Sequence, residues 1–210
     1  VATDAGAGCE VDLAARGGLI VGQDIGRQRQ GVDRFDAAGQ EAIGDLVDIV
    51  TWGEDLAHQR SMFFSLATYR EMLKPHHTEI FSLVKRMAPN ARIMFHSCGA
   101  VRPLISELAD TGVDVIQSIQ PLANGMDSFA LKRDFGDRVS FHGSIDVQQA
   151  MTGTLSDVEE ELKKRLQALA PGGGYILTTS NNLQADIPPE NLVRLFHLAK
   201  EWGRYPIRIE

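Results

Sequence analysis

The chain has 210 residues, of which 43% are hydrophobic and 23% are charged, an ordinary composition for one globular domain. Its formal net charge is −7, and it has no basic run, which argues against nucleic acid or an anionic membrane surface as a partner. No apolar run approaches the length of a membrane span, and no secretory signal is recognisable. Two cysteines, Cys9 and Cys98, do not make a disulfide framework, so we expect a cytoplasmic protein.

The first 44 residues are an atypical, glycine-rich segment. Their glycines do not fit the spacing of a phosphate-binding loop, so we do not expect a nucleotide site there. The stretch Phe35–Leu46 can be read as a helix. We therefore divide the chain into an N-terminal segment, 1–44, and one domain, 45–210.

From residue 47 the chain alternates between short apolar runs and amphipathic stretches. This pattern predicts five strand-then-helix units and hence a parallel sheet in an α/β fold. The expected strands are Val47–Trp52, Arg92–His96, Val113–Ile119, Val139–His142 and Tyr175–Thr179. The expected helices are Ala67–Met87, broken or restarted at Pro75, Val101–Asp110, Ser128–Phe135, Ser156–Ala170 and Pro189–Trp202. Ser156, with Glu159 three residues later, is expected to cap its helix.

Polar residues stand at or just after the carboxyl end of every expected strand. Both doubly wound sheets and (β/α)8 barrels bind ligands at that end, but a ring of groups from every strand favours the barrel. A full barrel needs about 250 residues. We therefore expect a fold of the (β/α)8 TIM-barrel type with about five units, a partial or truncated barrel. The strand-end groups are Glu54 and Asp55, His96 and Cys98, Gln117 and Gln120, His142 and Asp146, and Asn181 and Gln184.

The stretch Ile93–Gly99 carries the most distinctive chemistry. His96 and Cys98 are two residues apart where a strand opens into a loop, so their side chains point to the same side. An imidazole and a thiolate that converge in this way suit a zinc ion or a reactive thiol. The alternative is a buried free cysteine beside a hydrogen-bonded histidine.

Two further strand ends offer acid–base groups. Glu54 and Asp55 are adjacent, so only one of them can easily face the mouth of a barrel, where it would bind a cation or substrate or act as a base. A loop carboxylate that caps the next element is the alternative. His142, followed by Asp146, is typical of a histidine oriented by a carboxylate.

Neutral amides and a histidine pair complete the candidates. Asn181 and Gln184 are suited to hydrogen-bonding a substrate, and Gln59 lies in the same loop as the first carboxylates. His76 and His77 follow Pro75 on a helix, and we interpret them as surface or packing residues.

Taken in order, these motifs resemble the uroporphyrinogen decarboxylase superfamily, closest to its branch of decarboxylase-like proteins and corrinoid-dependent methyltransferases. The resemblance extends from about Asp45 to Trp202. It rests on Asp48–Leu56 with Gln59, Tyr69–Glu71 with Lys74–Pro75, Phe95–Gly99 with Val101–Leu104, Gly112–Asp114, Leu131–Lys132 with Phe135–Arg138, Phe141–Gly143 with Ile145–Asp146, Ala170–Tyr175 and Asn182–Asn191.

The resemblance implies a (β/α)8 barrel of which this chain carries roughly the last five units. In the decarboxylases, an aspartate and arginines from the first strands bind and protonate the porphyrinogen, and residues 1–44 do not match that segment. In the methyltransferases, a His-x-Cys and a later cysteine bind zinc. His96 and Cys98 match the first two ligands, whereas the third position is Asn181, a poor zinc ligand. Glu54 or Asp55 would then supply the third ligand.

We therefore predict an enzyme, most simply a zinc-assisted methyltransferase that moves a methyl group between a corrinoid and a thiol or similar acceptor. A decarboxylase acting on uroporphyrinogen or another polycarboxylate, and a non-catalytic truncated barrel, are the alternatives. The expected partners are a small-molecule substrate, a corrinoid protein and a second copy of the chain. The predicted site consists of metal ligands His96 and Cys98, catalytic Asp55 and His142, and substrate-binding Glu54, Gln59, Gln120, Asp146, Asn181 and Gln184.

Overall fold

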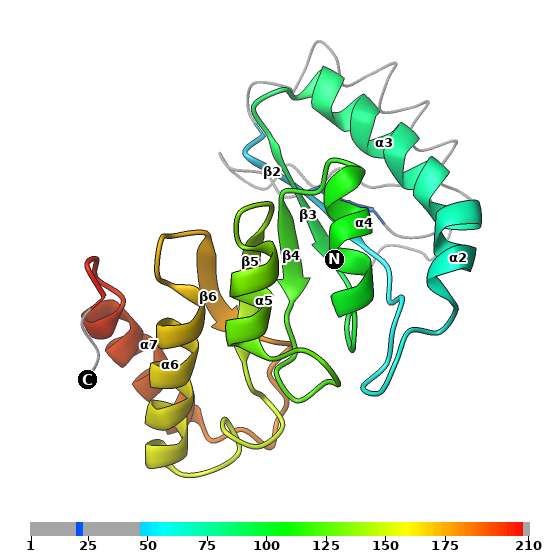
Figure 1. Cartoon of the computed structure of the whole chain (residues 1–210). Helices are drawn as coiled ribbons and strands as arrows, with labels where there is room; N and C mark the ends of the chain where they lie inside the picture. The colour runs from blue at the N-terminus through cyan, green and yellow to red at the C-terminus, as the bar shows by residue number, and fades with distance from the viewer. Residues whose placement is uncertain (1–19, 23–46, 208–210) are drawn as a thin grey trace, which may run out of the picture.

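A computed structural model describes residues 20–22 and 47–207. They contain a single sheet of six parallel strands (Figure 1). The strands are β1 (Ile20–Gly22), β2 (Ile49–Gly53), β3 (Arg92–His96), β4 (Val115–Ser118), β5 (Ser140–Ile145) and β6 (Tyr175–Thr179). The short β1 lies in the glycine-rich segment, where the sequence did not predict a strand.

The order of the strands identifies the type of α/β fold. In the sheet they follow one another as they do in the chain, from β1 to β6. A doubly wound sheet reverses its order at a switch point, whereas a (β/α)8 barrel keeps the order of the chain. The predicted fold, part of a (β/α)8 barrel, is therefore confirmed.

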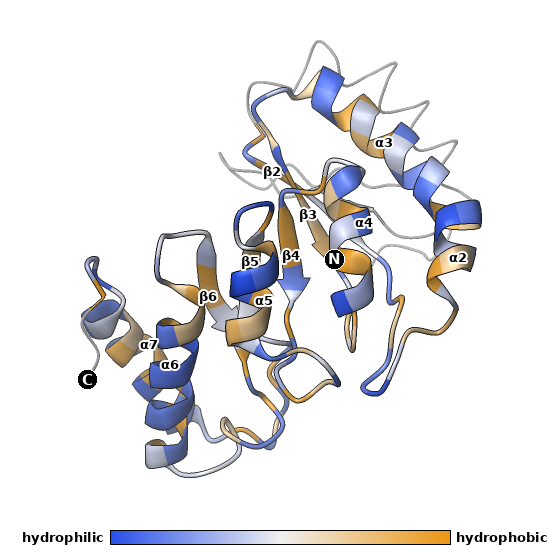
Figure 2. Cartoon of the chain, viewed as in Figure 1, coloured by the Kyte–Doolittle hydropathy of each residue, from blue (hydrophilic) through white to orange (hydrophobic). Residues whose placement is uncertain are grey.

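Helices follow each of the strands β2 to β6 and lie along the sheet (Figure 1). In Figure 2 the strands β3 and β4 are hydrophobic, whereas α6 presents many hydrophilic residues on the side that faces the viewer. The helices are α2 (Leu66–Thr68), a π-helical turn (Tyr69–Leu73), α3 (Lys74–Met87), a 3-10 turn (Arg102–Leu104), α4 (Ile105–Asp110), α5 (Ser128–Phe135), α6 (Leu155–Leu169) and α7 (Pro189–Trp202).

One face of the sheet forms the main hydrophobic core with the helices. Trp52 on β2 and Phe95 on β3 make edge-to-face contacts with Phe81 on α3, and Ile116 and Phe141 continue the same cluster across β4 and β5. Because neighbouring residues of a strand point to opposite faces, the residues that precede or follow these side chains point away from the helices. His96 is one of them.

Two local predictions, at Pro75 and at the start of α6, have different outcomes. Pro75 lies in the first turn of α3, directly after the π-helical turn, so the predicted restart of this helix is confirmed. The predicted cap of α6 is wrong, because Thr154 rather than Ser156 is the N-cap. Thr154 Oγ1 accepts a hydrogen bond from the backbone amide of Asp157, whose carboxylate in turn accepts one from the amide of Thr154. The helix read at Phe35–Leu46 lies outside the described residues.

Candidate metal centre

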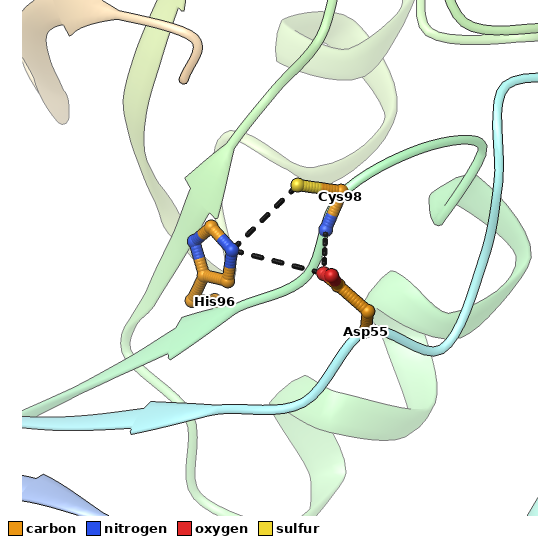
Figure 3. A group of neighbouring side chains, drawn as sticks. All are labelled: Asp55, His96 and Cys98. Carbon is orange, nitrogen blue, oxygen red and sulfur yellow. Dashed lines mark hydrogen bonds and ion pairs between the residues drawn. The ribbon is translucent and has the colours of Figure 1, made fainter. Parts of the chain in front are cut away.

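Three side chains meet at the carboxyl end of β2 and β3. Asp55 follows β2, His96 ends β3, and Cys98 stands two residues later (Figure 3). Nε2 of His96 lies 3.7 Å from Sγ of Cys98 and 3.7 Å from Oδ1 of Asp55. One ligand atom from each residue falls within 4.8 Å of the other two. The predicted convergence of His96 and Cys98 is thus present, and it includes Asp55.

The two adjacent carboxylates after β2 point to different places. Glu54 accepts hydrogen bonds from Nε1 of Trp52 and from Nε2 of the buried His77, each over 3.1 Å. Nδ1 of His77 in turn bonds to the hydroxyl of Tyr69 at 3.0 Å. Glu54, predicted to bind substrate, therefore contacts protein groups beside the helical core, and this anchor leaves Asp55 directed to His96 and Cys98.

The loop that carries Cys98 is held from three sides. Ser97 Oγ accepts a hydrogen bond from the backbone amide of Leu56 at 3.0 Å, and the amide of Gly99 donates to Oε1 of Gln120 at 2.8 Å. Gly99 has a φ of +84°, and a Cβ there would lie 2.6 Å from the carbonyl oxygen of His58. Only glycine permits this conformation and close approach, so the loop has a defined path beneath Cys98.

The protein groups around Cys98 favour its neutral thiol. Burial raises the pKa of Cys98 above its ordinary value, and the negative charge of Asp55 raises it further, while hydrogen bonds from Ser118 and Asn181 oppose the shift. Without a cation, these groups therefore do not create a thiolate nucleophile. A metal ion between Asp55 and Cys98 would compensate both negative charges.

The donor set fits zinc. Nitrogen, sulfur and carboxylate oxygen are the usual zinc ligands, at about 2.0–2.1, 2.3 and 2.0–2.2 Å, and a tetrahedral arrangement then separates nitrogen from sulfur by about 3.6 Å and nitrogen from oxygen by about 3.4 Å. The corresponding distances from His96 Nε2 are both 3.7 Å. These two separations are therefore within a few tenths of an ångström of zinc geometry, and the sulfur and the carboxylate oxygen lie within 4.8 Å of each other.

Asn181 stands where the similar methyltransferases have their third zinc ligand. Its side chain lies against Cys98, but an amide is a poor zinc ligand. Its Nδ2 donates a hydrogen bond to Cys98 Sγ at 3.4 Å. The amide contacts the sulfur from the loop after β6, 83 residues away in sequence. The described residues thus place three potential metal ligands together, with the amide of Asn181 and the hydroxyl of Ser118 beside the sulfur.

His142 lies two strands away from His96 in the same row of the sheet. The register pairs His96 with Gln117, and Gln117 with His142. Burial lowers the pKa of His142, and the nearby His96 lowers it further. The side chain is half-buried, and its Nδ1 is enclosed without a hydrogen-bond partner among the described residues. The expected pairing with Asp146 is not present.

The remaining predicted residues have different surroundings. The carboxylate of Asp146 accepts hydrogen bonds from the backbone amides of Gln148, Gln149 and Ala150, so it caps the turn after β5. Both oxygens therefore hold the turn, and the predicted substrate-binding role of Asp146 stays a prediction. Gln120 holds the Cys98 loop, a positioning role that sequence reasoning missed, as it also missed Ser97. Gln59 and Gln184 are exposed in the loops after β2 and β6.

No helix in residues 47–207 is long and apolar enough to cross a membrane.

The family model described as uroporphyrinogen decarboxylase (URO-D) matches residues 40–202. The protein named uroporphyrinogen decarboxylase from Vesicomyosocius okutanii subsp. Calyptogena okutanii (strain HA) is 26% identical over 142 residues, which are 68% of this chain and 37% of the relative. The chain thus matches well under half of that relative's length. Because the family model covers more than half of the chain, the protein belongs to the uroporphyrinogen decarboxylase family.

Proposed function

We propose that this member of the family is a zinc-assisted methyltransferase that moves a methyl group between a corrinoid and a thiol or similar acceptor. The observation that carries the proposal is the convergence of Asp55, His96 and Cys98 at the carboxyl ends of β2 and β3. Nε2 of His96 lies 3.7 Å from the sulfur of Cys98 and 3.7 Å from a carboxylate oxygen of Asp55. The ring of strand-end positions is where barrels of this type place their chemistry.

Each of the three residues has a defined part in the proposed site. Asp55 is exposed over 57% of its side chain and His96 over 33%, so a ligand from solvent can reach the cluster. Three protein ligands leave one position open on a tetrahedral zinc ion. When bound, zinc lowers the pKa of a coordinating thiol and so makes the thiolate available at neutral pH. Asn181 donates to the sulfur of Cys98 and stabilises its negative charge.

The proposed transfer balances without a further reactant. The acceptor thiol loses its proton to solvent, and its sulfur forms a bond to the methyl carbon. The bond between that carbon and the corrinoid cobalt breaks, and its electron pair stays on the cobalt. The chain's own residues orient the sulfur, while a corrinoid-carrying partner protein would present the methyl group. The expected homodimer remains a prediction.

A decarboxylase that acts on uroporphyrinogen or another polycarboxylate is the second candidate, and the name of the similar protein favours it. Several carboxylates bound at one site need cationic partners. In the described loops after β2 to β6, the candidates are Arg60, which is exposed, and Arg102, whose guanidinium pairs with Asp134. In these described loops, so few cationic side chains favour a methyltransferase over a decarboxylase of polycarboxylates. A non-catalytic barrel remains the third candidate.

The first experiment is elemental analysis of the purified protein after reconstitution with zinc under reducing conditions. The wild type is expected to hold about one zinc per chain, and Cys98→Ser is expected to lose it. Cys9→Ser makes the same substitution at the other cysteine of the chain and is expected to retain zinc. A wild type without zinc, or a Cys98→Ser variant that still holds it, would overturn the proposal.

A second experiment separates the two reactions. Free methylcobalamin with a small thiol is expected to lose its methyl group in the presence of the zinc-loaded protein, which the absorption spectrum of the corrinoid reports. Cys98→Ser should abolish the change. Conversion of uroporphyrinogen to less carboxylated products, with no effect on methylcobalamin, would instead establish the decarboxylase.

A further inference from the structure

A row of polar side chains continues from the metal centre across the sheet. The register places Gly53, His96, Gln117, His142 and Ile176 side by side on β2 to β6. The preceding residues Phe95, Ile116 and Phe141 belong to the core beneath the helices, so Gln117 and His142 share the opposite face with His96. The face that carries the metal ligands therefore also carries two further hydrogen-bonding side chains.

These two side chains have unused hydrogen-bonding capacity. Nδ1 of His142 is enclosed and has no partner among the described residues, and none of residues 47–207 bonds to the side-chain amide of Gln117. Native proteins satisfy most of their buried polar groups, and an exception points to a bound water, ion or ligand. Both residues are half-buried, so a ligand at the carboxyl ends of the strands can meet the exposed part of each side chain, whereas Nδ1 of His142 becomes accessible only if its surroundings move.

The distances suit a small acceptor that spans both sites. Neighbouring strands lie about 4.8 Å apart, so Gln117 and His142 stand one and two strand spacings, about 5 and 10 Å, from the His96 position. A group three or four bonds from a sulfur at the metal centre lies about one strand spacing away, which places it beside Gln117. His142 would reach the same group with its side chain from the next strand. Ile176 then closes the row with an apolar side chain that is 40% exposed.

The residues near Gln117 and His142 indicate whether the acceptor group that lies beside them is charged or neutral. An amide and an imidazole can each donate one hydrogen bond and accept another. A buried carboxylate needs a cationic partner, and the loops described after β4, β5 and β6 contain no lysine or arginine from 119 to 127, 146 to 154 or 180 to 188. The row therefore suits a neutral group that both donates and accepts.

We propose that Gln117 and His142 form a subsite that hydrogen-bonds a neutral hydroxyl or amide group of the acceptor thiol. This inference rests on the proposed function, because it takes the sulfur of the acceptor to lie at the metal centre. It assigns His142 a role in binding and orienting the acceptor, in addition to the catalytic role expected from the sequence.

The test uses Co²⁺ in place of zinc, because thiolate binding to Co²⁺ is visible in its absorption spectrum. Three thiols serve as probes: 3-mercapto-1-propanol, 1-butanethiol, which has a methyl group in place of the hydroxyl, and 3-mercaptopropionate, which carries a carboxylate. The wild type is expected to bind the alcohol about tenfold more tightly than butanethiol, as one satisfied hydrogen bond implies. The carboxylate should bind no better than butanethiol.

Two variants locate the effect. His142→Phe and Gln117→Leu are each expected to reduce the preference for the alcohol and to leave the affinity for butanethiol within about twofold, since neither residue is one of the proposed metal ligands. Gln149→Leu makes the same type of change at an exposed glutamine beside α6 and should preserve the preference. The Co²⁺ spectrum of each variant also reports an intact metal centre.

The outcomes separate the two proposals. Binding of Co²⁺ without a preference for the alcohol, or a preference that survives in both variants, would overturn the subsite and leave the metal centre standing. Failure of the wild type to bind Co²⁺ would overturn the proposed function and this inference together. A tighter complex with 3-mercaptopropionate than with the alcohol would show that the row takes an anionic group, which also contradicts the proposal.

Discussion

Asp55 accepts a hydrogen bond from the backbone amide of Cys98, with 2.8 Å between N and Oδ1, across 43 residues of sequence. The same oxygen lies 3.7 Å from Nε2 of His96. One carboxylate thus joins the end of β2 to the loop after β3 and also contributes the oxygen donor of the candidate metal centre. These two roles, structural and metal-binding, can be separated by substitution.

Asp55→Asn keeps an oxygen that can accept the hydrogen bond of Cys98 and removes the negative charge. We expect its zinc affinity to fall by about tenfold or more, while the free energy of unfolding of the metal-free protein changes by less than about 0.5 kcal/mol. Asp55→Ala should lower both quantities. Zinc competition titrations and urea unfolding measure them, and an Asp55→Asn variant with unchanged zinc affinity would show that the carboxylate is not a ligand.

Asn181→His should strengthen zinc binding. The asparagine amide already contacts Cys98 Sγ at 3.4 Å, so an imidazole at this position can supply a fourth strong ligand. We expect the variant to lose zinc to a chelator at least about tenfold more slowly than the wild type. Asn181→Ala, which removes the hydrogen bond and adds no ligand, should lose zinc faster. Equal rates in the two variants would place residue 181 outside the metal centre.

The cap of α6 gives a stability prediction with an internal control. Thr154→Ala removes the side chain that accepts the amide of Asp157 and should lower the free energy of unfolding by about 1 kcal/mol. Ser156→Ala, two residues away and exposed, should change it by less than about 0.5 kcal/mol. Urea unfolding at neutral pH gives both values. A larger loss at Ser156 would restore the cap expected from the sequence.

Gly143→Ala should be severely destabilising. Gly143 has a φ of +111°, and an added Cβ would collide with the carbonyl oxygen of Ser118 on the neighbouring strand. We expect a loss of about 3 kcal/mol or more in the free energy of unfolding. Gly173 also has a positive φ, +82°, but no atom lies within 4 Å of its Cβ position, so Gly173→Ala should cost only about 1–2 kcal/mol. Thermal or urea unfolding distinguishes the two.

Glu107 should make the protein sensitive to acid. Hydrogen bonds from Arg70 and Lys74 hold the pKa of Glu107 below its ordinary value of 4.5. A carboxylate with a lowered pKa in the folded state stabilises the protein above that ordinary value, and the contribution is lost as the pH falls through the folded-state pKa. Glu107→Gln should therefore destabilise the protein at pH 7 and have much less effect in strong acid.

The control for this prediction is Glu160→Gln, at an exposed position of α6. Urea unfolding at several pH values between neutral and strongly acidic conditions compares the two variants with the wild type. A Glu107→Gln variant whose difference from the wild type is the same at every pH would contradict the assigned electrostatic role.

The spacing of hydrophobic residues predicted the bounds of several strands and helices correctly. The bounds of β3, α5, β6 and α7 match the sequence prediction. The strand β5 extends to Ile145, beyond the predicted end at His142, because Gly143 and Ser144 continue to pair with β6. The sequence prediction placed the cap of α6 at Ser156, whereas the backbone geometry makes Thr154 the cap and starts the helix at Leu155.

The site was predictable where it depends on strand alternation and not where it depends on loops. His96 and Cys98 share one side of an extended stretch, so their convergence follows from local geometry. The choice between Glu54 and Asp55 required the buried His77, which binds Glu54 from a helix distant in sequence. Gln120 was expected to bind substrate, but its contact with Gly99 depends on how two loops meet, which no local pattern records.

In the row of residues from Gly53 to Ile176, the proposed metal site and the proposed acceptor subsite lie on different strands. The proposed metal ligands come from the ends of β2 and β3, whereas Gln117 and His142 stand on β4 and β5. In the proposed arrangement, a substitution on β4 or β5 would alter the acceptor subsite and leave the metal ligands in place. The preference for an acceptor would then be open to change at Gln117 and His142 independently of the residues that hold the metal.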